Sequence, residues 1–306
     1  MFDVVAIGNP VFDIIITPYV QTSGRVLSGC STNAALAVGK LGGRAGLIGK
    51  IGPDFEQVFI EVSRKYGVEA YPIESEESGG FYLKYLDERM DHRELKVIGI
   101  AGSIDFHEIP SRFLDSKSFV IGPILKEIDF DLVKNLLEHV DDDAIVFVDP
   151  QGLIRELNEG KVVRIANKGA YDIMSLVHFT KPNEHEANVL FPNMQPPEIA
   201  EEIEKKSKIA GIVTVAERGS YIAFEGKVYH IPAYRTTERD PTGCGDVYAG
   251  AFTYYYIKTG DILESAIFAS AAASFMVETT GPDFSLHFCD VKKRFEAIHE
   301  QVRRIK

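Results

Sequence analysis

Residues 239–246, RDPTGCGD, run directly into an apolar segment from Val247 to Tyr256 and predict a turn that feeds a helix. Gly243 and Gly245 leave the backbone free to adopt left-handed angles and to present N–H groups to a ligand without a Cβ in the way. At a helix N-terminus those groups, with about half a positive charge from the helix dipole, favour an anion such as phosphate. Asp246 would lie in the first helical turn beside that anion. Alternatively, the glycines only shape a tight turn and Asp246 only complements the dipole.

Length and composition indicate a globular protein that handles small molecules. The 306 residues are 45% hydrophobic, which is ample for a large buried core in one domain spanning 1–306. Cys30, Cys244 and Cys289 are odd in number and have no metal-like spacing, so we expect a reducing cytoplasm rather than a disulfide framework or zinc site. The start of the chain lacks secretory features, and no apolar run reaches membrane-spanning length. A net charge of −12 disfavours nucleic acid as a partner.

Strand and helix signals alternate along most of the chain. Between several short apolar runs lie helix-length segments at 32–41 and 129–140, which predicts an α/β fold with a doubly wound, mainly parallel sheet and helices on both faces. The predicted strands are 2–7, 45–51, 118–122, 144–148, 176–180 and 209–215. Two segments, approximately 12–27 and 78–102, are rich in β-formers and predict a small antiparallel flap, or lid.

Two further patterns concern the second half of the chain. Residues 220–224 and 227–231 flank Glu225-Gly226, which predicts a hairpin. At the end, one apolar face predicts a helix that continues to Ile305, with its members at Val291, Phe295, Ile298, Val302 and Ile305.

Polar residues near the N-terminus are candidate ligand contacts. Gly29 permits close backbone approach, and Asn33 offers donors and acceptor lone pairs to a hydroxylated ligand. Asp13 could accept hydrogen bonds from two substrate hydroxyls. Each polar side chain has a plainer alternative, because Asn33 is also common at a helix N-terminus and Asp13 in a turn or on the surface.

Asn183 and Glu186 follow a predicted strand and open a helix. Three residues apart on one face of the first turn, they have the oxygens to hold Mg²⁺ through its waters. The same spacing is typical of a capping box, in which Asn caps the helix and Glu reaches back. The residues alone leave both readings open.

These positions together resemble the ribokinase-like, or PfkB, family of carbohydrate and nucleoside kinases, over nearly the whole chain. Four features carry the likeness in the family's order: Asp13, Gly29 to Asn33, Asn183-x-x-Glu186, and Asp240 to Asp246. The resemblance implies a ribokinase-like fold with a lid. It also implies transfer of the ATP γ-phosphate to a hydroxyl of a sugar, polyol or nucleoside.

The resemblance assigns roles to the residues. Asp246 would be the general base that deprotonates the acceptor hydroxyl, while the N–H groups of Gly243, Cys244 and Gly245 stabilise the transferred phosphoryl group. The substrate would contact Asp13, Gly29, Asn33 and Gln151. The nucleotide and its Mg²⁺ would contact Asn183, Glu186, Arg218, Gly219, Thr242 and Ser270. A monovalent cation such as K⁺, as in some members, would take oxygens from Asp240, Thr242, Gly281 and Ser285.

Some positions leave substrate and donor open. Ser28 and Ala216 stand where many members have glycine, and Ser270 stands where sugar-specific members often have Asn near the adenine. Gln151 lies in a stretch similar to members that act on polyols such as myo-inositol, although it could equally be a turn residue. Cys244, a thiol at a helix N-terminus, is expected to have a depressed pKa, with packing as its main role.

Two other classes of protein share this architecture. A non-catalytic nucleotide or sugar sensor is one alternative, since fold does not dictate function. A nicotinamide-dependent dehydrogenase is another, but Gly8-Asn9-Pro10 after the first strand lacks the G-x-G-x-x-G fingerprint. Because unpaired strand edges seek cover, we also expect a homodimer formed through the lid.

Overall fold

Continuously apolar segments form the centre of a mainly parallel sheet in the computed structural model, which describes residues 1–90, 92–158 and 160–306. All residues of β1 (Val4–Ile7) and β8 (Ser118–Ile121) are buried, as expected for strands covered on both faces. Within the described residues the order of the ten strands is β16 (Arg303–Arg304), β15 (Lys227–Ile231), β14 (Ser220–Phe224), β13 (Ala210–Thr214), β12 (Phe179–Thr180), β9 (Ile145–Val148), β8, β1, β4 (Ala45–Ile51) and β5 (Val68–Glu74). The pairs from β13 to β5 are parallel, and β14 to β16 extend one edge in antiparallel fashion.

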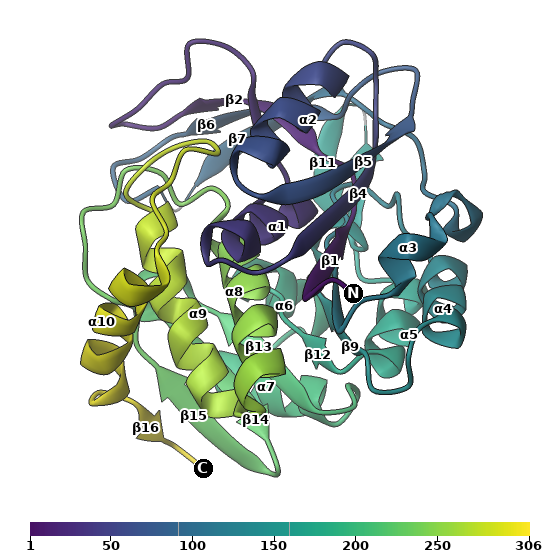
Figure 1. Ribbon diagram of the computed structural model, residues 1–306. Helices are drawn as coiled ribbons and strands as arrows, with labels where there is room; N and C mark the ends of the chain where they lie inside the picture. Colours follow the sequence, from purple (N-terminus) through teal and green to yellow (C-terminus); the bar gives the residue numbers. More distant parts are fainter. Residues whose placement is uncertain (91, 159) are drawn as a thin grey trace.

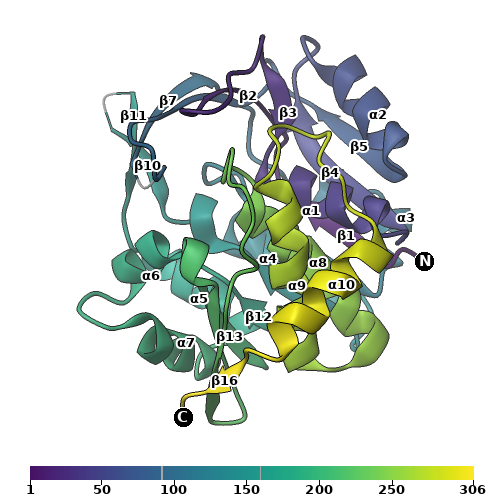
Figure 2. The same ribbon diagram turned by 90° about the vertical axis from the view of Figure 1, so that its left-hand side faces the viewer.

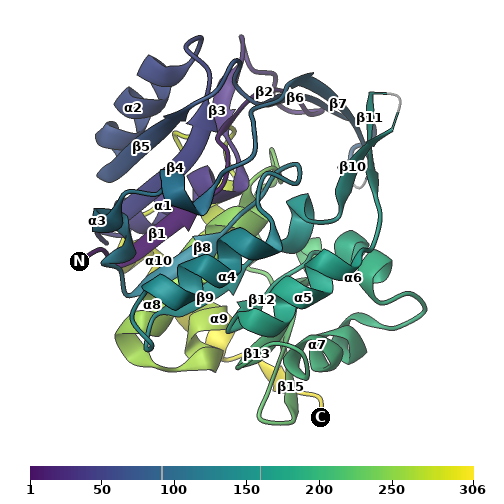
Figure 3. The ribbon, with the colours of Figure 1, turned by 90° about the vertical axis from the view of Figure 1, so that its right-hand side faces the viewer.

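Helices cover both faces of this sheet, as Figures 1 and 3 show. One layer contains α1 (Cys30–Lys40), α2 (Glu56–Lys65), α8 (Cys244–Thr259), α9 (Ile262–Met276) and α10 (Phe288–His299). The other contains α3 (Ser111–Leu114), α4 (Phe130–His139), α5 (Lys168–Leu176), α6 (Glu184–Leu190) and α7 (Pro196–Glu204). Short 3₁₀ turns are η1 (Phe106–Glu108), η2 (Pro150–Gly152) and η3 (Ala216–Arg218). The expected doubly wound α/β fold is therefore confirmed.

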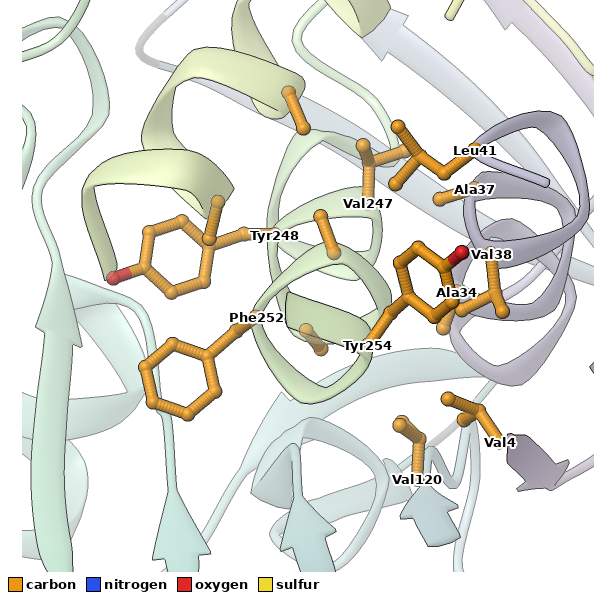
Figure 4. Close-up of a cluster of buried hydrophobic side chains, with 14 of the residues drawn as sticks. Val4, Ala34, Ala37, Val38, Leu41, Val120, Val247, Tyr248, Phe252 and Tyr254 are labelled. Atoms are coloured by element: carbon orange, nitrogen blue, oxygen red, sulfur yellow. The ribbon is translucent and has the colours of Figure 1, made fainter. Parts of the chain in front are cut away.

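Helix α8 is buried at the centre of its layer because it is apolar on nearly all sides. Figure 4 shows Val247 beside Leu41 of α1 and Tyr254 beside Val38, with residues of β1 and β8 beneath them. The helix also contacts β8 and β9. This packing brings the first turn of α8 to the carboxyl ends of those strands, where ligands bind in open α/β sheets.

A second, smaller sheet forms the lid, and Figure 2 shows it along the upper side of the molecule. Its order is β10 (Arg155–Asn158), β11 (Lys161–Arg164), β7 (Arg93–Gly99), β6 (Gly80–Tyr85), β2 (Val11–Ile16) and β3 (Val26–Ser28). All its pairs are antiparallel except that of β2 with β6. Four strands lie in the two segments that the sequence indicates, apart from residue 91, which lies outside the described residues. Strands β10 and β11 come from a part of the chain where the sequence predicts no lid.

Two further differences from the sequence-based expectations concern element ends. The prediction that the last helix continues to Ile305 is wrong: α10 ends at His299, and Arg303–Arg304 pair with β15. Val302 keeps the apolar spacing because it packs on the same core from outside the helix. Leu176 closes α5 rather than opening β12. Among the described residues, no helix combines the length and apolar character needed to cross a bilayer.

Candidate active site

A cavity of about 980 Å³ is lined by the lid, by the carboxyl ends of the central strands and by the first turn of α8. Most of the site residues expected from the sequence line it: Asp13, Gly29, Gln151, Asn183, Glu186, Gly219, Thr242, Gly243, Cys244, Gly245, Asp246 and Ser270. The remaining ones do not: Asn33, Arg218, Asp240, Gly281 and Ser285. The structure thus gathers residues that are up to 257 positions apart, Asp13 and Ser270, around one space.

The turn before α8 has the conformation that its glycines predict. Gly243 has a φ of 85°, and a Cβ there would lie 2.7 Å from Asn33 Nδ2 and 2.8 Å from the Met276 methyl group. Cys244 N donates to Pro241 O at 3.3 Å, so this amide is engaged within the turn. Among the described residues, the N–H groups of Gly243 and Gly245 have no protein acceptor. Two of the three expected amides are therefore available to an anion.

Asp246 is half-buried in the first turn of α8, and Asn33 Nδ2 donates to its Oδ2 at 3.0 Å. Burial raises the pKa of Asp246, and the nearby Asp149 carboxylate raises it further, against the hydrogen bond from Asn33 and the charge of Lys181. Asn33 lies in the fourth position of α1 and does not cap that helix. Its buried Oδ1 has no partner among the described residues, so this side chain keeps an unused acceptor next to Asp246.

Lys181 and Asp149 also belong to the site, although the sequence analysis gives them no role. Lys181 Nζ lies 2.8 Å from Asp149 Oδ2, with side chains only 2% and 4% exposed. Burial disfavours the charged form of Lys181, but the Asp149 and Glu186 carboxylates outweigh this and raise its pKa. One ligand atom each of Cys30, Asp149 and Asp246 lie within 4.8 Å of one another. The sequence shows only that each residue directly follows a predicted strand; the neighbouring, parallel arrangement of β9 and β12 in the sheet brings the pair together.

Asn183 and Glu186 form a capping box, which is one of the two interpretations that the sequence allows. Glu186 N donates to Asn183 Oδ1 at 3.0 Å, and Asn183 N donates to Glu186 Oε2 at 2.9 Å. Both residues nevertheless line the cavity. Burial raises the pKa of Glu186, Asp149 adds to the rise, and Lys181 and Arg155 oppose it. The cap orients the Glu186 carboxylate without removing it from the cavity wall.

Asp13 and Gln151 lie on the lid side of the cavity. Asp13 is buried in β2, where its Oδ1 accepts from Phe81 N at 2.9 Å. Burial raises the pKa of Asp13 to about 7, against hydrogen bonds from Phe81 and Ser28. Gln151, in η2, accepts at Oε1 from Arg155 Nη2 at 2.7 Å. Gly29 has a φ of 115°, and its missing Cβ would lie 3.2 Å from Asn9 O, so the backbone here requires glycine.

The residues expected near the nucleotide are more dispersed. Arg218 is half exposed and pairs with Glu184. Gly219 has a φ of 95°, and a Cβ there would lie 2.0 Å from Ile231 O, so hairpin packing already explains this glycine. Ser270 Oγ donates to Pro232 O at 3.2 Å, and Thr242 Oγ1 lies 3.0 Å from Tyr85 Oη.

The expected cation ligands surround a carboxylate that already has protein donors. Asp240 is fully buried; its Oδ1 accepts from Thr242 N at 2.9 Å and its Oδ2 from Thr280 Oγ1 at 2.5 Å. Gly281 is buried with a φ of 72°, whereas Ser285 is exposed. A monovalent ion at Asp240 would have to share its oxygens with these donors.

The expectation of a depressed pKa for Cys244 is wrong. Burial raises the pKa of this thiol, and the carboxylates of Asp240, Glu238 and Asp246 add to the rise. Cys244 stays a neutral thiol that contributes its backbone and its packing.

Comparisons with known proteins agree with this fold. The model of the pfkB family carbohydrate kinases matches residues 159–289. A cytidine kinase from Thermococcus kodakarensis is 27% identical, over 87% of this chain and 92% of its own. A solved pyrophosphate-dependent myo-inositol kinase variant has a TM-score of 0.81 and 21% identity, covering 96% of this chain and 98% of its own. An E. coli protein assigned to ribokinase II and solved with ATP and Mg²⁺ has a TM-score of 0.76 and 19% identity. The match covers 97% of this chain and 100% of the E. coli chain.

The structural matches show that the fold is ribokinase-like. The sequence matches confirm the resemblance to the PfkB family: the family model covers residues 159–289, and the matches to a cytidine kinase and a deoxyribokinase cover 87% and 97% of the chain.

Proposed function

We propose that this protein is a kinase that transfers the γ-phosphoryl group of ATP to a hydroxyl of a small sugar, polyol or nucleoside. The observation that carries the proposal is the position of Asp246, whose pKa is raised by burial, one residue beyond the open amide of Gly245 in the same cavity. The names of the similar proteins include a nucleoside kinase, an inositol kinase and a ribokinase, which supports all three acceptor classes.

In the proposed reaction Asp246 accepts the proton of the acceptor hydroxyl. Its raised pKa makes it a stronger base than an exposed carboxylate, and Asn33 fixes its orientation through the 3.0 Å hydrogen bond. The amides of Gly243 and Gly245, at the positive end of α8, stabilise charge on the phosphoryl group. Phosphoryl transfer depends mainly on such positioning and electrostatics, so this small set of groups suffices.

The donor set at α6 fits Mg²⁺. Carboxylate and amide oxygens are ligands that Mg²⁺ accepts, and the buried Glu186 carboxylate and the Asn183 side chain both line the cavity. Asn183 and Glu186 would hold the ion through water. When bound, Mg²⁺ would neutralise charge on the donor phosphates.

The first prediction tests this function by comparing Asp246, the third residue of α8, with Asp290, the third residue of α10. Purified protein with Mg²⁺ and ATP should release ADP with at least one member of a panel of sugars, polyols and nucleosides. Asp246→Asn should lower kcat by roughly 10²- to 10⁴-fold, because an amide is no base. Asp290→Asn is the matched control, since Asp290 is also the third residue of its helix but lies outside the cavity, with a side chain that is 44% exposed and paired with Lys293 at 2.7 Å.

Pyrophosphate belongs in the same assay as a second donor, because one structural neighbour is named as pyrophosphate-dependent. Turnover with pyrophosphate but not with ATP would show that pyrophosphate is the phosphoryl donor, and the proposed role of Asp246 as the base would be unaffected. Absence of turnover with either donor across the panel, or full activity of Asp246→Asn, would contradict the proposed function.

A further inference from the structure

Three arginines share the face of the lid that lines the cavity. Arg93 lies on β7, Arg155 on β10 and Arg164 on β11. Arg155 and Arg164 are direct cross-strand partners, and side chains opposite each other on paired strands lie on the same face. Like charges in that arrangement are destabilising. The lid therefore concentrates positive charge at one place in a protein whose net charge is −12.

Carboxylates of the described residues compensate these charges only through space: Glu186 acts on all three guanidinium groups, Asp13 on Arg93 and Asp149 on Arg155, without an ion pair at contact distance. The acceptors that the structure provides are neutral: Arg155 donates from Nη1 to Ile124 O at 3.2 Å and from Nη2 to Gln151 Oε1 at 2.7 Å. Arg93 Nη1 donates to Tyr85 Oη at 3.4 Å. In the described part of the chain, the buried Nε atoms of Arg155 and Arg164 have no acceptor at all.

The electrostatics differ within the cluster: burial acts to lower the pKa of Arg93, but Tyr85, Glu186 and Asp13 outweigh it and raise that pKa, whereas the other two arginines are less well compensated. Burial lowers the pKa of Arg155, and repulsion from Arg93 and Arg164 lowers it further, while Glu186 and Asp149 oppose this. Burial likewise lowers the pKa of Arg164. Buried donors without acceptors and buried charges without partners are both costly, so a ligand that supplies negative charge would relieve two costs at once.

The cluster adjoins the acceptor end of the cavity. Arg155 binds Gln151 directly, and its guanidinium carbon lies 5.9 Å from the centre of the Phe81 ring. The N–H of Phe81 donates to Asp13. Asp13 and Gln151 are the residues that the resemblance assigns to the substrate, which places Arg155 and its cross-strand partner Arg164 beside it. Arg93 lies between this end and the turn at Gly243, because its acceptor Tyr85 Oη lies 3.0 Å from Thr242 Oγ1.

We propose that the acceptor substrate carries an anionic group, a phosphate or a carboxylate, that binds to Arg93, Arg155 and Arg164. This inference rests on the proposed function and narrows its substrate class. The planar guanidinium group binds two oxygens of a carboxylate or of a phosphate at once, through two parallel hydrogen bonds, and neither a neutral sugar nor a neutral nucleoside offers such a charged pair of oxygens.

The second prediction is tested by calorimetric binding without any phosphoryl donor. Each pair of ligands consists of a neutral sugar and an anionic derivative of it: ribose and ribose 5-phosphate, fructose and fructose 6-phosphate, glucose and gluconate. At least one anionic member should bind roughly 10- to 100-fold more tightly than its neutral partner, as expected for hydrogen bonds between charged groups. Arg164→Gln should remove most of that preference. Arg93→Gln is a second variant in case the first does not fold.

Lys96→Gln is the matched control, because it removes one positive charge from the exposed side of β7 in the same sheet. It should leave the preference unchanged, and a loss as large as that of Arg164→Gln would point to net charge and overturn the proposal. Equal binding of both members in every pair would also overturn it. The proposal would also be overturned if the arginine variants weakened only the binding of ATP or pyrophosphate, since the cluster would then bind the phosphoryl donor. Anion preference without phosphoryl transfer would contradict the proposed function and leave the anion site standing.

Discussion

Lys181 and Asp149 are nearly fully buried with a separation of 2.8 Å between Nζ and Oδ2, so bulk water solvates neither charge. Removal of one partner leaves the other charge uncompensated in the interior. The third prediction is therefore that the substitution Lys181→Met lowers the free energy of unfolding by about 3–5 kcal/mol. Chemical denaturation at neutral pH, with the midpoint and slope fitted together, measures this loss.

A second substitution distinguishes lost charge compensation from lost packing. Asp149→Asn keeps an acceptor for Gln151 N, which donates to Asp149 Oδ1 at 3.2 Å, and removes the charge. The double variant Lys181→Met with Asp149→Asn should therefore be more stable than Lys181→Met alone. Lys134→Met is the surface control: its partner Glu138 lies 3.8 Å away and both side chains are more than half exposed, so the expected change is below about 1 kcal/mol. A double variant no more stable than Lys181→Met alone would show that packing, not charge, dominates.

The two ends of α8 provide a matched pair of glycines for the fourth prediction. Gly243 before the helix and Gly260 after it both have left-handed φ values, 85° and 70°. A Cβ on Gly260 meets nothing within 4 Å, whereas one on Gly243 would overlap Asn33, which orients Asp246. Either alanine should cost about 1–2 kcal/mol of stability through backbone strain. Only Gly243→Ala should also lower kcat/KM, by roughly tenfold or more, because the hydrogen bond to a charged group is disturbed.

Steady-state kinetics and thermal unfolding of both variants separate the two effects. Equal loss of kcat/KM in Gly243→Ala and Gly260→Ala would mean that activity follows global stability and that the turn has no special part in it.

Elements defined by local signals were predictable, and elements defined by distant partners were not. The hairpin at 220–231 has the predicted strand ranges because Glu225 and Gly226 adopt the positive φ values, 51° and 68°, of a tight hairpin turn. Strands β10 and β11 escaped prediction because they join the lid through β7, which is far away in sequence. The same reason hid the pairing of Lys181 with Asp149: each follows its own strand, and only the strand order brings them together.

Most of the large exposed apolar side chains of the described residues lie on or next to the lid, which indicates how the protein assembles. Six of the large apolar residues that are exposed among the described residues lie on the lid strands or in the segments next to them: Tyr19, Leu86, Ile98, Ile100, Leu157 and Ile165. The lid sheet also has two free edges, β3 and β10. Exposed apolar residues and unpaired edges on one element are typical of a surface that another chain covers.

The fifth prediction is that the protein forms a homodimer through the lid, with a mass in solution twice the 34.0 kDa of one chain. Replacing Ile98 and Ile100 together by Glu would place unpaired charges in that interface, and the dissociation constant should rise by roughly 100-fold or more. Val58→Glu in α2 is the control, since Val58 is 42% exposed but lies outside the lid. Sedimentation over a range of concentrations measures all three proteins. A wild-type chain that stays monomeric at every concentration, or a control that dissociates as readily as the lid variant, would rule out this interface.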